Sequence, residues 1–179
     1  MRLILFSLIA LVVAVGCSSS PKAAKTASPA VVAKASEAQT AELLGRIKTL
    51  DGTWEMIGPD GQKSTIIFKT VSGGTAVREI MFPGTSHEMT NMYHMDGPSI
   101  VMTHFCAAGN QPRMRATAFV NNSIAFASDS VSNLTSMNDQ YMGAMTLVFK
   151  DSDHIEERWQ HMAGDKVSHG PNFELTRVK

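Results

Sequence analysis

Two arginines two residues apart, Arg113 and Arg115, are the side chains of this sequence best suited to bind an anion. A guanidinium group stays charged when it is buried, and it binds a carboxylate through two parallel hydrogen bonds. If the two arginines face an enclosed apolar space, they would hold the carboxylate end of a small amphipathic molecule. The sequence leaves the alternative that both point outward, or pair with Glu79, Glu88 or Glu157 as structural ion pairs.

Histidines and a cysteine suggest a second chemistry, the binding of a metal ion or haem. Imidazole and thiolate groups are ligands of zinc, copper and haem iron. No histidine pair has a close ligand spacing such as H-x-x-x-H, so a metal or haem site is the alternative hypothesis. The candidate metal ligands are His87, His104, His161 and His169, with Cys106 as a possible thiolate.

Cys106 also raises the question of catalysis, because a thiol beside His104 or His87 could act as a nucleophile. His104 and Cys106 are two residues apart on one expected strand, which does not force their tips together. Nothing in the sequence marks a site for an oxyanion. We therefore expect a binding protein rather than an enzyme.

The elements that must position these residues are β-strands. From Trp54 to Arg177 about ten short β-prone runs are separated by tight turns at nearly even spacing, with no room for crossover helices. This pattern predicts an all-β fold, a single up-and-down antiparallel β-barrel of about ten strands. Turns of such a barrel alternate between its two rims. The rim with the longer loops, near 58–61, 83–85, 107–111, 129–140 and 164–165, is the candidate mouth.

Two-residue turns set the expected faces of the strands. A turn at Asp96-Gly97 opposes Tyr93 to Ile100, and a turn at Asn121-Asn122 opposes Phe119 to Ile124. The second turn puts both arginines on the face of Phe119. If the bulkier faces point inward, the predicted ligand-binding residues in the lumen are Arg113, Arg115, His104, Cys106, His87, Tyr93 and Trp159.

The N-terminus has the form of a secretion signal over residues 1–16, with Arg2 before the apolar run Leu3–Val15. Ala14-Val15-Gly16-Cys17 resembles the lipobox of bacterial lipoproteins. The resemblance implies cleavage before Cys17, diacylglycerol on its sulfur, and anchoring of the mature protein to a membrane. Since Ser18 follows rather than aspartate, it also implies the outer membrane, facing the periplasm; ordinary secretion is the alternative.

After the signal, we expect three segments. Residues 17–35 are a lipidated, flexible tether of Ser, Ala, Lys and Pro. Residues 36–50 form an amphipathic helix that Ser36 caps and that closes one end of the barrel with its apolar residues, Leu43, Leu44, Ile47 and Leu50. Residues 51–179 form the barrel.

Composition excludes one class of partner. The formal net charge is +0, and no basic run occurs beyond the tether, so the sequence lacks the positive field of a nucleic-acid-binding protein. Once Cys17 is lipidated, Cys106 is the only thiol left, and an internal disulfide cannot form.

Gly52-Thr53-Trp54 resembles the Gly-x-Trp signature of lipocalins and the wider calycin group. In those barrels the tryptophan lies at the closed end under a basic residue from near the last strand, a place that Arg177 can occupy. The resemblance implies a calycin-like barrel in which Trp54 and Arg177 are structural. The expected function is a membrane-anchored envelope protein that holds a small apolar or amphipathic ligand in its lumen. A metal- or haem-binding barrel and a structural envelope lipoprotein without ligand are the alternatives.

Overall fold

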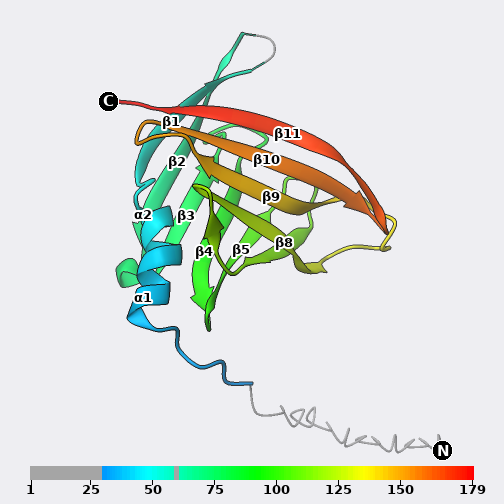
Figure 1. The fold of residues 1–179 in the computed structure, drawn as a ribbon. Helices are drawn as coiled ribbons and strands as arrows, with labels where there is room; N and C mark the ends of the chain where they lie inside the picture. The colour runs from blue at the N-terminus through cyan, green and yellow to red at the C-terminus, as the bar shows by residue number, and fades with distance from the viewer. Residues whose placement is uncertain (1–29, 59–60) are drawn as a thin grey trace, which may run out of the picture. The chain divides into compact units, whose positions relative to one another are not determined.

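A computed structural model describes residues 30–58 and 61–179 of the chain. The predicted signal, Cys17 and most of the predicted tether lie outside these residues. A compact unit from Val32 to Lys179 contains a helical segment and a closed antiparallel β-barrel, as the sequence predicts (Figure 1).

Among the described residues, eleven strands form one sheet, and all of them except β7 make up a closed ring. Each strand pairs with the next along the chain, except that β6 does not pair with β7. β1 pairs with β11, and the ring closes where β6 pairs with β8. The strands are β1 (Gly52–Ile57), β2 (Lys63–Val71), β3 (Ala76–Met81), β4 (Met89–Asp96), β5 (Ser99–Phe105), β6 (Gln111–Ala116), β7 (Phe119–Val120), β8 (Ser123–Ser132), β9 (Tyr141–Phe149), β10 (His154–Ala163) and β11 (Lys166–Arg177).

A helical segment closes one end of the barrel. It consists of α1 (Glu37–Thr40), a π-helical turn η1 (Ala41–Gly45) and α2 (Arg46–Lys48). Ser36 caps it, since the Ser36 hydroxyl accepts from the Gln39 N–H and the Gln39 side chain accepts from the Ser36 N–H. The predicted apolar face is buried in the core, through Leu43, Leu44, Ile47 and Leu50.

Trp54 and Arg177 make the contact that the lipocalin resemblance implies. The indole is fully buried and donates to the Leu50 carbonyl at 2.8 Å, which ties β1 to the helical segment. The Arg177 guanidinium lies 4.3 Å from the centre of the Trp54 ring and donates to the carbonyls of Asp51 and Thr49. These bonds join the end of the last strand to the start of the first, and the barrel is consistent with a lipocalin-like or calycin-like fold.

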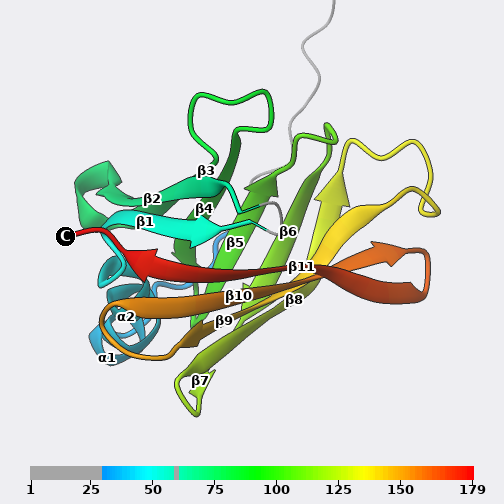
Figure 2. The ribbon, with the colours of Figure 1, turned by 90° about the horizontal axis from the view of Figure 1, so that it is seen from above.

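The pairing of β1 with β11 is short. Only Trp54 and Glu55 of β1 have partners on β11, and beyond them the two strands part (Figure 2). A cleft of about 810 Å³ lies at this point, between the β1 residues Met56 and Ile57 and the β11 residues Pro171 and Phe173. Met56 and Phe173 also pack against the core, so the cleft reaches the edge of the barrel interior.

The β4–β5 hairpin turns one residue later than predicted. Asp96 pairs with Ser99, so the turn is Gly97-Pro98, with Gly97 at a φ of +60°. Tyr93 therefore opposes Met102 instead of Ile100. Because the register moves by two residues, every side chain of the hairpin keeps its predicted face. At the second turn, Phe119 pairs with Ile124 as predicted.

Candidate functional site

Six polar or amphipathic side chains meet inside the barrel, and each is at most 3% exposed. They lie on inward positions of four strands, where alternate residues belong to the core. β3 contributes one of them, β4 two, β5 one and β10 two. We call this group the buried polar cluster: Glu79, Asn91, Tyr93, His104, Glu157 and Trp159.

One side of the cluster is a chain of hydrogen bonds that ends at a carboxylate. The Asn91 amide nitrogen and the Tyr93 hydroxyl both donate to Oε2 of Glu79, at 2.8 and 2.6 Å. Asn91 Oδ1 lies 2.6 Å from Nδ1 of His104. Since this amide oxygen can only accept, His104 carries its hydrogen on Nδ1 and leaves Nε2 as a bare acceptor.

The other side of the cluster connects His104 to Glu79 through Trp159 and Glu157. The rings of His104 and Trp159 are 5.0 Å apart, and the Trp159 indole donates to Oε2 of Glu157 at 3.1 Å. The Glu157 carboxyl group in turn forms a hydrogen bond with Glu79. The contacts therefore run in a closed circuit through five of the six side chains.

Burial determines the charges in the cluster. Desolvation raises the pKa of Glu79, although hydrogen bonds from Asn91 and Tyr93 oppose the rise. Desolvation, followed by the charge of Glu79, raises the pKa of Glu157 well above its usual value, so Glu157 holds the proton that the two carboxyl groups share. Burial lowers the pKa of His104 to about 4, so the imidazole is neutral at pH 7.

Three atoms of the cluster are buried without a hydrogen-bonding N–H or O–H group among the residues described: Glu79 Oε1, Glu157 Oε1 and His104 Nε2. The proton shared by the carboxyl groups is the one hydrogen that the two Oε1 atoms have available. An unsatisfied buried polar group costs about 1–3 kcal/mol. No arginine or lysine is buried in the described part of the chain, so the interior contains acceptors without a compensating cation.

The structure brings together three of the predicted ligand-binding residues, His104, Tyr93 and Trp159. The other two candidates near the mouth are not in the cluster. His87 is exposed in the loop between β3 and β4, and Cys106 is half-buried where the β5–β6 loop begins.

The histidines proposed as metal ligands do not converge either. His161 and His169 lie on the paired strands β10 and β11, whereas His104 is buried on β5 and His87 is in a loop. Within residues 30–58 and 61–179, no group of three or more His, Cys, Asp or Glu side chains is placed to hold a metal ion.

The prediction that Arg113 and Arg115 face the lumen is wrong. On β6 the inward residues are Met114 and Ala116, which are buried in the core, and both arginines lie on the outer face. The prediction extended the alternation of Phe119 backward through residues 117 and 118. These two residues are outside any strand, and a bulge at Arg113/Met114 interrupts the pairing with β8, so the alternation is not continuous.

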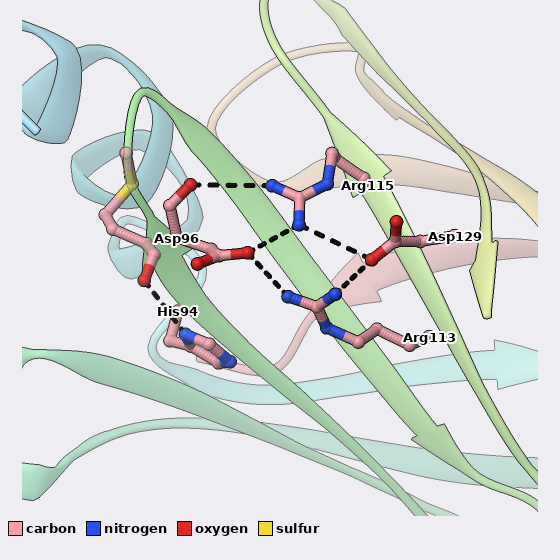
Figure 3. Close-up of polar contacts among 6 residues, drawn as sticks. His94, Asp96, Arg113, Arg115 and Asp129 are labelled. Carbon is pink, nitrogen blue, oxygen red and sulfur yellow. Dashed lines mark hydrogen bonds and ion pairs between the residues drawn. The ribbon is translucent and has the colours of Figure 1, made fainter. Parts of the chain in front are cut away.

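The two arginines form an ion-pair network with two aspartates on the outside of the barrel (Figure 3). Arg113 and Arg115 both bond Asp96 of β4 and Asp129 of β8. Hydrogen bonds from Arg115 and Arg113 lower the pKa of Asp96. Because each guanidinium group already has two carboxylate partners, the network is a structural link between strands rather than a free anion site.

Three residues of the cluster, Glu79, Asn91 and Glu157, were not among the predicted site residues. The sequence suggested Glu79 and Glu157 only as possible partners of the arginines. The alternation of residues along the strands could have placed both glutamates on the inner face. Glu79 lies two residues from buried Met81, and Glu157 lies two residues from buried Ile155. A carboxylate at an inward position of a barrel strand is a candidate for function.

Searches against protein-family models and against curated proteins gave no match to this chain. In the portion of the chain that the structure describes, no helix is both long and apolar enough to cross a membrane. The closed barrel is a fold compatible with ligand binding.

Proposed function

We propose that this protein is a membrane-anchored binding protein of the bacterial cell envelope that holds a small amphipathic molecule in the lumen of its barrel. The polar end of the ligand meets the buried polar cluster. Its apolar part packs among the neighbouring core residues, which include Met102, Met114, Phe126 and Met145.

The observation that carries the proposal is a set of three buried atoms inside the barrel, Glu79 Oε1, Glu157 Oε1 and His104 Nε2, which have one carboxyl proton among them. A barrel that serves only as a scaffold is most stable with an apolar interior, and two carboxyl groups and an imidazole lower its stability. Buried polar groups without partners mark sites that await a ligand, an ion or an ordered water. A ligand that donates hydrogen bonds would satisfy them.

The cluster also changes the expected chemistry of the ligand. With both arginines outside, the lumen has no described cation to bind a carboxylate end, and Glu79 would repel one. The ligand's polar end must therefore donate hydrogen bonds. The cleft between β1 and β11 is the proposed entrance, because Met56 and Phe173 line both the cleft and the core.

Membrane anchoring is proposed from the lipobox-like sequence at Cys17. The expected result is that palmitate labels the wild-type protein, which then sediments with outer membranes. Cys17→Ser should abolish the label and release the protein into the soluble fraction. Sedimentation of an unlabelled wild-type protein would contradict lipidation.

Native mass spectrometry of the gently extracted protein tests ligand binding. We expect the wild-type protein to retain one small molecule, and His104→Phe to retain much less because it removes the Nε2 acceptor while keeping a ring against Trp159. His87→Phe, at an exposed histidine, is the matched control. If all three proteins carry no bound molecule and lipid extract does not change their melting temperatures, a binding function is contradicted.

Haem or a metal bound through one protein nitrogen is the second candidate function. His104 supports it, because Nε2 is free while Nδ1–H is fixed by Asn91, as in metal-bound imidazoles. A haem Soret band in the native protein that disappears in His104→Phe would favour this candidate over the first.

A further inference from the structure

Glu79 Oε1, Glu157 Oε1 and His104 Nε2 belong to one connected group rather than to separate places in the barrel. Asn91 links His104 to Glu79, and the shared proton links Glu79 to Glu157. Trp159 completes the circuit from Glu157 back to His104. A single small group bound within this circuit is the simplest way to satisfy all three atoms.

The charge of the cluster restricts what that group can be. The Glu79 carboxyl group has three neutral partners, Asn91, Tyr93 and the proton-bearing Glu157, and no cation among them. Since no described lysine or arginine is buried, the interior favours a cation and disfavours an anion. The acceptors need three hydrogens from one group, and an ammonium group has three N–H donors, whereas water has two and an alcohol one.

We infer that the ligand's polar end is a primary ammonium group, which donates to Glu79 Oε1, Glu157 Oε1 and His104 Nε2. The inference rests on the proposed function, since it names the chemical class of the molecule held in the lumen. The ligand class is therefore an amphipathic primary amine with an apolar tail.

Binding of the ammonium group displaces the proton that the two carboxyl groups share. Glu157 gives up its proton to solvent, and the ammonium then lies between two carboxylates. The other titratable groups of the cluster keep their states: Tyr93 of β4 stays protonated as a donor to Glu79, and His104 of β5 stays neutral with its hydrogen on Nδ1. One proton is released for each amine bound.

Calorimetric titration with three ligands of equal tail length tests the inference: n-octylamine, 1-octanol and octanoate at pH 7. We expect octylammonium to bind about tenfold or more tightly than octanol, because charge-assisted hydrogen bonds are the stronger ones, and octanoate to bind least. Titrations in phosphate and MOPS, which differ in ionisation enthalpy, should show release of about one proton per amine.

Glu157→Gln should bind octylammonium no more tightly than octanol and should release no proton. Glu156→Gln is the matched control, because Glu156 is the preceding residue of β10 and pairs with Arg158 instead of the cluster. The Glu156→Gln variant should keep the wild-type preference for octylammonium over octanol.

Two results would overturn the inference and are distinguishable from each other. If octanol or octanoate binds as well as the amine, without proton release, the ammonium assignment fails while a ligand-binding lumen stands. If none of the three ligands binds at millimolar concentration, the inference and the proposed binding of such amphipathic ligands fail together.

Discussion

Replacement of Glu157 by glutamine tests the shared proton through the pH dependence of stability. Burial and the charge of Glu79 raise the folded pKa of Glu157 well above its usual value, so over a range of pH the folded barrel keeps a proton that the unfolded chain has lost. Over the pH range in which the folded barrel holds this extra proton, Glu157 lowers the wild-type free energy of unfolding by about 1.4 kcal/mol for each unit that the pH rises.

His104 has the opposite effect over a lower pH range. Burial lowers its pKa from the ordinary 6.5 of histidine to about 4 in the folded barrel, so between these pH values the unfolded chain binds the extra proton. Stability from His104 is complete above pH 6.5 and is lost as pH falls toward 4, by about 1.4 kcal/mol per unit. The wild-type profile should therefore change less between pH 5 and 6, where His104 opposes the two carboxyl groups of Glu79 and Glu157, and should fall above about pH 6.5, where only the carboxyl groups act.

Glu157→Gln keeps the effects of His104 and Glu79 and removes that of Glu157. The variant should gain more stability than the wild type between pH 4.5 and 6.5, where His104 alone contributes about 2 kcal/mol, and it should lose less stability than the wild type above pH 6.5.

Urea unfolding at each pH, followed by the fluorescence of the buried Trp54 and Trp159, measures both profiles. Glu156→Gln is the control, because hydrogen bonds from Arg158 lower the pKa of Glu156 to about 2 and its effect is confined to acid pH. Equal slopes for wild type and Glu157→Gln between pH 6.5 and 7.5 would refute the shared proton.

Three further substitutions test other contacts of the barrel. Trp54→Ala should lower the free energy of unfolding by about 3–5 kcal/mol in urea titrations, and unchanged stability would contradict its role at the closed end. Gly170→Ala should cost about 1–3 kcal/mol, because a Cβ there would lie 2.9 Å from the backbone of Trp159, and a neutral effect would contradict this close approach of β11 to β10. Asp96→Ala should cost about 1 kcal/mol at low salt and less in 1 M NaCl, and a loss independent of salt would argue against the ion-pair network.

The sequence was sufficient for the features that local chemistry determines. Ser36 and Gln39 specify the start of the helical segment, and the spacing of Leu43 and Ile47 specifies its buried face. The rhythm of turns and alternating residues specifies the barrel. The Gly-x-Trp resemblance located both ends of the Trp54–Arg177 contact.

The site was less predictable because it depends on whether the inward and outward alternation continues from strand to strand and on how the barrel closes. Residues 117 and 118 interrupt the alternation between β6 and β7, and no residue there signals that the faces exchange. Glu79 and Glu157 are 78 positions apart in the sequence. They meet only because the ring brings the inner faces of β3 and β10 together. When strand faces are assigned by their apolar residues, a glutamate makes its face look like the outer one.

A crystal structure of the natively purified protein at atomic resolution is the most direct test of a ligand site in the lumen. We predict electron density for a bound molecule within hydrogen-bonding distance of Nε2 of His104, continuing toward the cleft between β1 and β11. Side chains or a single ordered water filling that position in the native protein would contradict the proposed site.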